Sequence, residues 1–329
     1  MPKGFWKTIK KPLVAIAPMA NVTDVAFRAI LTKYGKPDVM WTEFVSADGL
    51  CSSKGREKLL GDLAFSKKER PIVAQIFSSK PEKIYEATKL VASLGFDGID
   101  INMGCPDRAV VKQGAGAALI KNPKIAQEII FAAQKGAGKI PVSVKTRIGY
   151  SKDEIETWIP MLAQSNLDAI TIHGRTMKEM SKVPAHWDLI AESANIIRSF
   201  HNKKTCPIIL GNGDVQNRKE AEEKCKQYGV DGVMIGRGIF TNIYAFRKKE
   251  KVLTIENRIK ILLDHIKEFE KIHKNDEDAK TRKFDYLKKF FKIYISDFDG
   301  AKELRIQLMN SHSTEEVRAV VEAFKSRTF

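Results

Sequence analysis

Eight short apolar runs, rich in β-branched residues, alternate with longer helix-like stretches in the first two thirds of this chain. The runs span 13–19, 39–44, 71–77, 97–104, 141–147, 168–174, 206–213 and 230–238. Such alternation is typical of repeated βα units whose parallel strands are buried on both faces. Eight consecutive units predict an α/β fold of the TIM type, a closed (β/α)₈ barrel.

The stretches between the runs carry helix signals. PEKIYEATKLVASLG (81–95) has proline at its start and glycine at its end, and NPKIAQEIIFAAQKG (122–136) follows the same order. The alternative is an open, doubly wound sheet with a glycine-rich phosphate loop after the first strand. MANVTD (19–24) contains no glycine, and GAGAAL (114–119) and GNGDVQ (211–216) lack the sixth-position glycine of a dinucleotide fingerprint. The barrel is therefore favoured.

The last quarter of the chain has a different character. Glycine nearly disappears, and apolar residues recur at helical spacing through 257–272, 284–295 and 313–324. We therefore expect two domains, a barrel over 1–244 and an all-helical domain over 245–329. HKNDEDAK (273–280) is predicted to be a loop, and Ser313 with Glu316 is predicted to form a capping box.

Composition narrows the functional classes. The 56 Lys and Arg residues exceed the 40 Asp and Glu residues, and the net charge of +16 is spread along the chain. Such an excess suits a polyanionic partner, and it equally suits a solubilising surface. No apolar run reaches membrane-spanning length, and no signal peptide is recognisable. The four cysteines show no metal-binding or disulfide spacing, so we expect a cytoplasmic protein with no metal site, no membrane contact and no obligate protein partner.

Polar residues mark the carboxyl ends of most of the predicted strands. Any one of them alone is more simply explained as a hydrogen-bonded core residue or a solvated strand end. Together they predict a ligand site, because catalytic groups of such barrels lie at this end and an apolar interior would leave them unpaired. The residues are Gln75, Asp100, Asn102, Lys145, Arg147, His173, Arg175 and Asn212.

Two glycine-containing loops predict that the ligand carries a phosphate. GNGD (211–214) and GRG (236–238) follow the seventh and eighth predicted strands, where such barrels often hold phosphate groups. Arg237 would add charge-assisted hydrogen bonds, whereas Asp214 would orient backbone or a ribityl hydroxyl. A phosphorylated cofactor is therefore the leading expectation.

Cys105 follows the fourth predicted strand directly, in NMGCPD. A thiol in this place can be a nucleophile, a proton donor or an inert packing group. We favour a general acid, because a nucleophilic thiolate usually needs an adjacent base and only His173 is a candidate through space.

The motifs together resemble the tRNA-dihydrouridine synthase family over nearly the whole chain. They are APMANVTD (17–24), VAQIFSS (73–79), DINMGCP (100–106), VKTRIG (144–149), ITIHGRT (170–176), GNGD (211–214) and GVMIGRG (232–238). The resemblance implies an FMN-dependent enzyme that reduces a uridine of tRNA to 5,6-dihydrouridine with NADPH as reductant. Hydride would pass from flavin N5 to uracil C6, and Cys105 would protonate C5.

The resemblance also implies a role for each residue of the site. Asn102 would anchor the target base, and Arg175 would contact base or phosphate. Lys145 would stabilise the anionic reduced flavin. The implied cofactor-binding residues are Ala17, Pro18, Met19, Gln75, Lys145, His173, Asn212, Gly213, Asp214, Gly236 and Arg237.

The substrate is less narrowly defined than the cofactor. KTRKFDYLKKFFKIY (280–294) interleaves basic and aromatic residues, and we expect its aromatics in the core and its lysines facing RNA. The chain departs from the family pattern at 177–190 and at Ile243–Tyr244, in loops expected near substrate. The alternatives are the same reaction on ribosomal RNA, a flavin barrel of the dihydropyrimidine or dihydroorotate type, and a noncatalytic RNA-binding protein.

Overall fold

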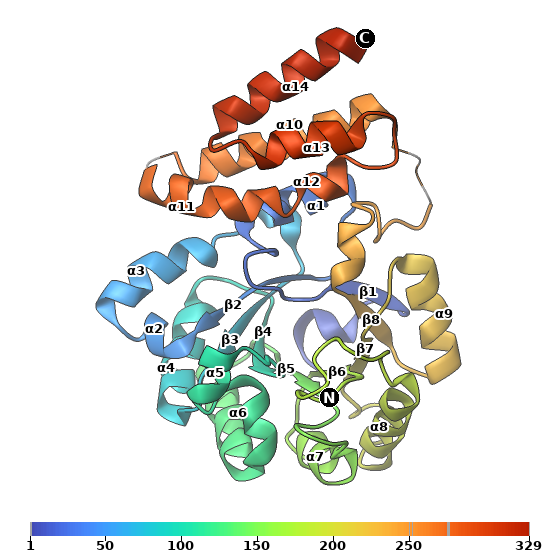
Figure 1. Cartoon of the computed structure of the whole chain (residues 1–329). Helices are drawn as coiled ribbons and strands as arrows, with labels where there is room; N and C mark the ends of the chain where they lie inside the picture. Colours follow the sequence, from blue (N-terminus) through green and yellow to red (C-terminus); the bar gives the residue numbers. More distant parts are fainter. Residues whose placement is uncertain (1, 250, 252, 275–276, 329) are drawn as a thin grey trace.

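All eight predicted strands form, and they pair in parallel within one curled sheet at the centre of the molecule (Figure 1). The structure, a computed structural model, describes residues 2–249, 251, 253–274 and 277–328. The sheet order β1-β8-β7-β6-β5-β4-β3-β2 is that of a (β/α)₈ barrel, which confirms the predicted fold. The strands are β1 (Leu13–Ile16), β2 (Met40–Ser46), β3 (Ile72–Phe77), β4 (Gly98–Met103), β5 (Val142–Arg147), β6 (Ala169–His173), β7 (Ile208–Asn212) and β8 (Gly232–Ile235).

The two edges of the sheet meet between β1 and β2. Ala15 and Val39 form an isolated parallel bridge there, and the Asp38 N–H donates to the Val14 carbonyl at 2.8 Å. The observed strands are shorter than most of the predicted runs. Residues 17–19 after β1 and 236–238 after β8 are loop and 3-10 helix, and these loops are available to line a site.

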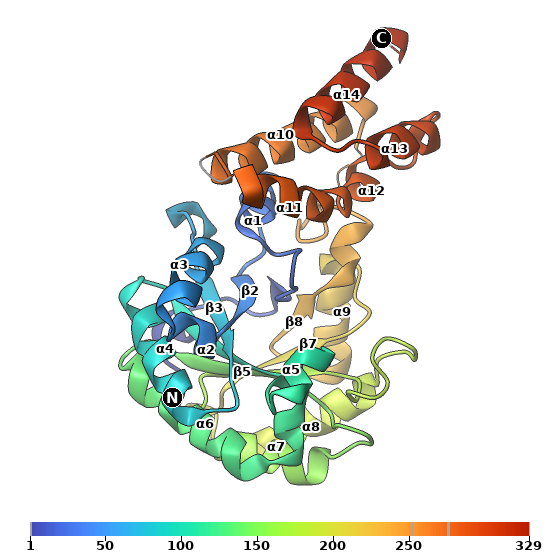
Figure 2. The ribbon, with the colours of Figure 1, turned by 60° about the vertical axis from the view of Figure 1, so that its left-hand side comes forward.

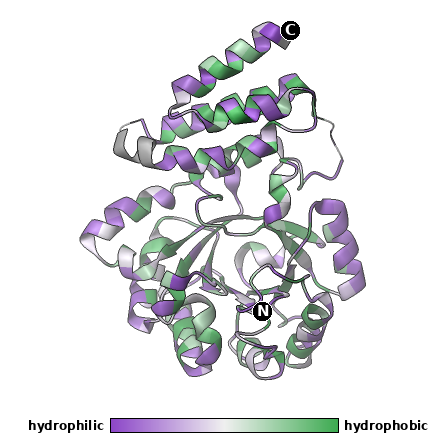
Figure 3. Cartoon of the chain, viewed as in Figure 1, coloured by the Kyte–Doolittle hydropathy of each residue, from purple (hydrophilic) through white to green (hydrophobic). Residues whose placement is uncertain are grey.

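Helices cover the outside of the barrel. They are α1 (Val25–Tyr34), α2 (Ala47–Leu50), α3 (Ser53–Asp62), α4 (Pro81–Ser93), α5 (Arg108–Lys112), α6 (Pro123–Ala137), α7 (Ile155–Ala163), α8 (Trp187–Ser199) and α9 (Arg218–Tyr228). Their apolar faces pack on the outward side chains of the strands, and polar residues cover the outer faces of α3 and α9 (Figure 3). Short 3-10 helices lie at η1 (Gly4–Lys7), η2 (Lys67–Glu69), η3 (Gly116–Lys121) and η4 (Arg237–Phe240).

The amino-terminal end of the barrel is filled by apolar side chains. Trp6 of η1 is buried there, with its ring centroid 6.0 Å from that of Trp41. Above it lie inward-facing apolar residues of the strands, including Leu13, Val73 and Leu210. This packed floor leaves only the carboxyl ends of the strands open to a ligand.

The helical part lies over one side of the barrel, above α1 (Figures 1 and 2). It comprises α10 (Ile255–Ile272), α11 (Glu277–Lys288), α12 (Phe291–Tyr294), α13 (Ala301–Met309) and α14 (Thr314–Thr328). The contact is aromatic, because Phe27 of α1 packs on Phe290 with ring centroids 4.5 Å apart. Phe290 is fully buried, so its side chain joins the two parts of the chain.

Three local predictions for the helical part need correction. The predicted helix 284–295 is interrupted at Lys289–Phe290, where the chain turns Phe290 toward α1. The predicted loop 273–280 is shorter, since α11 begins at Glu277; residues 275 and 276 lie outside the described residues. Only half of the capping box is as predicted, because Ser313 Oγ accepts from the Glu316 N–H at 3.2 Å while the Glu316 carboxylate accepts from the His312 N–H instead.

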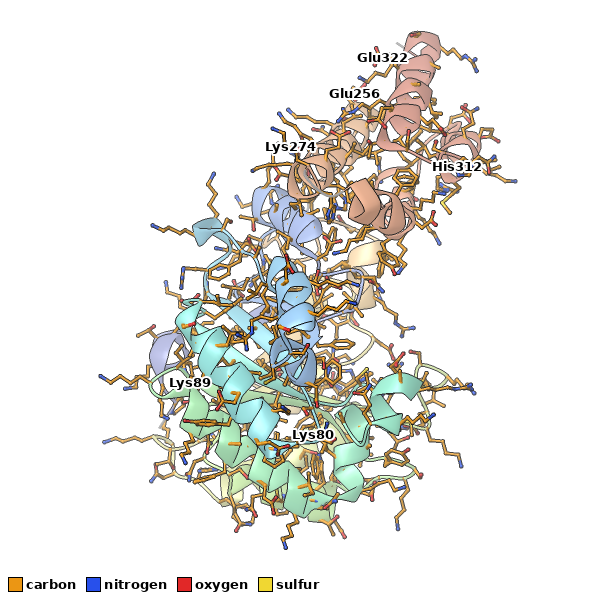
Figure 4. All side chains as sticks on the ribbon, turned by 90° about the vertical axis from the view of Figure 1, so that its left-hand side faces the viewer. Lys80, Lys89, Glu256, Lys274, His312 and Glu322 are labelled. Carbon is orange, nitrogen blue, oxygen red and sulfur yellow. The ribbon has the colours of Figure 1, made fainter. Side chains whose placement is uncertain are left out.

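Charged side chains are distributed over both parts of the molecule. Figure 4 shows Lys80 and Lys89 projecting from the barrel and Glu256, Lys274 and Glu322 projecting from the helical part. Within the described residues no helix combines the length and the apolar character that a membrane span requires.

Candidate active site

The carboxyl ends of the strands surround a cavity of about 460 Å³. Asp100, one of the polar residues at the predicted strand ends, is fully buried and does not line this cavity. All of the residues to which the resemblance gives a role do line it: Ala17, Pro18, Met19, Gln75, Asn102, Cys105, Lys145, His173, Arg175, Asn212, Gly213, Asp214, Gly236 and Arg237. They come from the ends of seven of the eight strands, all except β2, so the parallel register of the barrel brings together residues that are far apart in the sequence. Their individual roles remain predictions.

Gln75 and Asn102 belong to one buried hydrogen-bond chain. Gln75 Nε2 donates to Asp100 Oδ2 at 2.6 Å, and Gln75 Oε1 accepts from Asn102 Nδ2 at 3.0 Å. Ser143 Oγ donates to the other carboxylate oxygen of Asp100 at 2.5 Å. Burial raises the pKa of Asp100 to about 6 despite these bonds. These hydrogen bonds orient the Gln75 amide at the bottom of the cavity.

Asn102 also holds the loop that carries the candidate acid. Its Oδ1 accepts from the N–H groups of Gly104 at 3.1 Å and Cys105 at 2.8 Å. Arg147 Nε donates to the Gly104 carbonyl at 2.7 Å from the other side. The Asn102 side chain, near the end of β4, and the neighbouring Arg147 guanidinium thus position the Cys105 backbone. This is a role for Asn102 in addition to the predicted contact with a base.

The Cys105 thiol is partly buried at the edge of the cavity. Burial raises its pKa, so the sulfur keeps its proton at neutral pH even though Arg147 and Lys145 act in the opposite direction. A protonated thiol is suited to donating a proton and poorly suited to nucleophilic attack. This property supports the general-acid interpretation over the thiolate alternative.

Lys145 is the central cation of the cavity. Its Nζ donates to Asn212 Oδ1 at 2.9 Å, and Asn212 Nδ2 donates to the Met234 carbonyl at 2.9 Å. These two bonds place a lysine from β5 against β7 and β8. Burial and the nearby Arg147 lower the pKa of Lys145 to about 8, against the opposing effect of Asp100.

A second network connects β6 with the loop after β7. Arg175, with a side chain only 3% exposed, donates to the Val183 carbonyl at 2.6 Å and pairs with Asp214. Asp214 also accepts from the Ala185 N–H at 2.9 Å and from Arg237 at 3.2 Å. Asp214 is therefore bonded to one backbone N–H and to two arginines.

His173 is neutral within this network. Burial, reinforced by Arg147 and Lys145, holds its pKa well below the usual value. Arg175 Nη1 lies 3.2 Å from His173 Nε2, and because a guanidinium only donates, Nε2 accepts and the ring proton resides on Nδ1. The neutral ring leaves Lys145 and the arginines as the cations of the site.

Two glycines make the predicted phosphate loops possible. Gly213 has a φ of +135°, a conformation that L side chains rarely adopt, and a Cβ there would lie 2.5 Å from the Ala185 Cβ. At Gly238 a Cβ would lie 2.5 Å from the Val215 carbonyl oxygen. Glycine at 213 therefore lets the loop after β7 approach the loop between β6 and α8, and glycine at 238 lets the loop after β8 approach the loop after β7.

The cavity has further lining residues that were not predicted as site members. Arg147 was among the polar residues at the strand ends but was given no role in cofactor or substrate binding, although it shares a strand face with Lys145. Phe44 faces the cavity because β2 shifts register between Trp41 and Phe44, which no sequence pattern signals. Ser181 lies in an irregular loop and offers no signal either.

The charge and the volume of the cavity together indicate which ligands it can bind. The lining contains Lys145, Arg147, Arg175 and Arg237 but only one carboxylate, that of Asp214. A volume of about 460 Å³ falls in the range of about 300–1,000 Å³ that small-molecule sites occupy. Excess positive charge beside paired glycine loops fits an anionic, phosphate-bearing cofactor, and FMN has this chemistry. The fold and site thus define a cofactor-dependent (β/α)₈-barrel enzyme.

Comparison with known proteins identifies the family. The dihydrouridine synthase (Dus) family profile matches residues 15–329. The probable tRNA-dihydrouridine synthase 2 of Bacillus subtilis (strain 168) is 43% identical over 329 residues, which cover 99% of this chain and 98% of the relative. A probable tRNA-dihydrouridine synthase of Staphylococcus aureus (strain MRSA252) is 42% identical over 328 residues, with 99% and 97% covered. The chain belongs to the dihydrouridine synthase family.

The predicted family is therefore confirmed, and with it the enzyme class. The protein is an oxidoreductase that acts on a CH–CH bond, with FMN as cofactor and NAD(P)H as reductant. Among solved structures, morphinone reductase in complex with tetrahydroNAD aligns with a TM-score of 0.51 at 12% identity, over 74% of this chain and 88% of that chain. At this identity the likeness concerns the barrel fold alone.

Proposed function

We propose that this protein reduces a specific uridine of tRNA to 5,6-dihydrouridine, with NADPH as the reductant. The observation that carries the proposal is one thiol, that of Cys105, lining a cavity with four basic side chains and a single carboxylate. The names of the relatives, probable tRNA-dihydrouridine synthases, support tRNA as the substrate.

The cofactor would lie across the open end of the barrel. Its ring would rest against the loop that carries Ala17, Pro18 and Met19, with the Gln75 amide at the pyrimidine edge. Lys145 and His173 would hold the same edge. The loops with Gly213 and Gly236 would hold the phosphate, with Arg237 as the flexible cation, since its side chain is 62% exposed. When bound, FMN supplies the hydride for uracil C6.

Cys105 would complete the reduction by donating its proton to uracil C5. Its raised pKa keeps this proton in place until negative charge develops on the base. Asn102 would contribute to this step in two ways. Its Oδ1 accepts from the Cys105 N–H, and its Nδ2 retains one hydrogen that can be donated to the base. Arg175 is bonded to protein groups on both sides, so its contact with substrate would be through the remaining donors of its guanidinium.

The helical domain over 245–329 would bind the RNA body while the target base is extruded into the barrel. Phe284, Leu287, Phe291 and Tyr294 are buried, which supports the interpretation of the aromatics as core. Lys289 and Lys292 are exposed, whereas Lys283 pairs with Asp62 at 3.0 Å and Lys288 with Asp285 at 3.0 Å. Lys289 and Lys292 are therefore the stronger RNA-facing candidates.

We place the reaction in the cytoplasm, where tRNA and NADPH are found together. All four cysteines, Cys51, Cys105, Cys206 and Cys225, are free thiols, which supports a reducing compartment.

The test is reduction of RNA by the purified protein. Enzyme loaded with FMN is mixed with NADPH and unmodified tRNA transcripts, and dihydrouridine is located by mass spectrometry of RNA fragments. We expect one modified position in tRNA. The same assay is run with ribosomal RNA and with free pyrimidines as substrates. If only one of these is reduced, then that compound, and not tRNA, is the substrate. A protein that binds no FMN would favour a noncatalytic role.

A further inference from the structure

A bulge in β2 directs the side chains of Glu43 and Phe44, which are neighbours in the sequence, toward different parts of the molecule. Trp41 pairs with Val73 and Phe44 pairs with Gln75, so Thr42 and Glu43 together stand opposite Ala74 alone. Such a bulge re-aims the residues around it and is frequent beside active sites. Here Phe44 lines the cavity, and Glu43 contacts the loop between β1 and α1.

Glu43 bonds directly to the loop that carries Ala17, Pro18 and Met19 into the cavity. Its Oε1 accepts from the backbone N–H of Asn21, which has a φ of +55°. Most other bonds of this loop stay within it, because the Met19 carbonyl accepts from the N–H groups of Val22 at 3.1 Å and Thr23 at 3.0 Å. The Glu43 carboxylate therefore ties the turn of the loop to the barrel wall.

A buried arginine holds the far end of the same loop. Arg28 Nη1 donates to the Thr23 carbonyl at 2.7 Å, and Arg28 Nε donates to Glu69 at 2.8 Å. Both partners of this ion pair are at most 2% exposed. The start of the loop is held as well, because the Ala17 N–H donates to the Ile235 carbonyl at 2.9 Å. The bond from Asn21 to Glu43 holds the middle of the loop between these two ends.

The charges around Glu43 make its proton sensitive to the helical part. They come from Asp24 and Arg28 of the α1 region, Asp62 at the end of α3, and Lys283 of α11. Burial, followed by repulsion from Asp24, raises the pKa of Glu43 to about 7. The carboxylate thus gains its proton near neutral pH, and the hydrogen bond to Asn21 then loses its charge assistance.

We propose, on the basis of the function proposed above, that Glu43 is a positioning residue for the cofactor site. Through the Asn21 N–H its carboxylate holds the 17–24 loop, and with it Met19, in the position that FMN requires. Charged Glu43 favours the bound state, so FMN binds more weakly as pH falls and Glu43 takes up its proton. Lys283 stabilises the charged form and so connects the helical part to this loop.

The first test measures the FMN dissociation constant by flavin fluorescence between about pH 5.5 and about pH 8.5. For the wild type we expect the dissociation constant to rise about 5–10-fold on the acid side, the difference between a charged and a neutral hydrogen bond. Glu43→Gln should bind at the weak level and lack the change on the acid side. Glu57→Gln makes the same change at an exposed position of α3 and should follow the wild type.

A second variant separates this role from a general loss of structure. Lys283→Gln removes a positive charge near Glu43 and should move the midpoint of the pH dependence to higher pH. Wild-type affinity and wild-type pH dependence in Glu43→Gln would overturn the proposal. An unmoved midpoint in Lys283→Gln would overturn the connection to the helical part. Intact pH-dependent FMN binding without any dihydrouridine formation would overturn the proposed function and support the role of Glu43.

Discussion

The floor and the mouth of the barrel are built from the same strands but have opposite chemistry. Leu210 belongs to the apolar floor, and Asn212, two residues further along β7, lines the cavity. Val73 and Gln75 show the same change along β3. Because side chains two apart in a strand share a face, both members of each pair point inward. The position of a residue along its strand, and not the strand to which it belongs, therefore determines whether the residue contributes to stability or to the ligand site.

Charged side chains are also distributed unequally between the mouth and the floor. The mouth concentrates Lys145, Arg147 and Arg175, whereas apolar side chains cluster on the floor. Asp100 lies beneath the mouth, where it accepts a hydrogen bond from Gln75, and burial raises its pKa to about 6. Substitutions in the two layers should therefore have separable consequences.

The largest effect is expected at the mouth, for Cys105→Ala. Without the proton donor, dihydrouridine formation should fall by about 10²–10⁴-fold. FMN binding and flavin reduction by NADPH should persist, because they do not use this proton. Single-turnover measurement of both half-reactions checks the prediction. Cys206→Ala changes a partly buried thiol outside the cavity and should behave as wild type; undiminished turnover in Cys105→Ala would remove Cys105 from the mechanism.

A floor substitution should act on stability instead. Leu210 is fully buried, and Leu210→Ala should destabilise the barrel by about 2–5 kcal/mol through lost burial and a cavity. Urea unfolding measures the loss, with Leu94→Ala as the control because Leu94 is 37% exposed. Equal effects of the two substitutions would contradict the packed floor.

A smaller effect is expected for Lys145→Met, which keeps the length of the side chain and removes its charge. Loss of a charged hydrogen-bond donor should weaken FMN binding by about 10–100-fold. In the wild type, FMN affinity should also fall as pH rises past about 8, since the lowered pKa of Lys145 lets it lose its proton there. The variant should lack this alkaline change. Lys139→Met, an exposed lysine before the start of β5, is the matched control.

The smallest effect is expected for single surface lysines of the helical part. Lys289→Gln or Lys292→Gln should weaken tRNA binding about 2–5-fold and reduce the salt slope by less than about one unit each. Lys288→Gln should do less, because that side chain is only 13% exposed and pairs with Asp285. Filter binding over a range of salt concentrations measures all three. A larger loss for Lys288 than for Lys289 would reverse this order.

Much of the fold and site was predictable from short-range pattern. Apolar runs located the strands, and polar residues at their ends located the mouth, including Lys145 and His173. Two features were missed because their causes are long-range. The break before α12 follows from the packing of Phe290 on Phe27, and the exposure of Phe44 to the cavity follows from the bulge in β2.

Local sequence alone was enough to establish the barrel and the residues that end each strand, because strand periodicity and helix signals act over a few residues. The pairings that give those residues their properties arose only on folding. Asp214 meets Arg175 from 39 residues away, and Lys145 meets Asn212 from 67 residues away. Which cations remain without a counter-charge, and hence what the cavity can bind, depends on such distances through space, and these are set by the packing of the whole barrel.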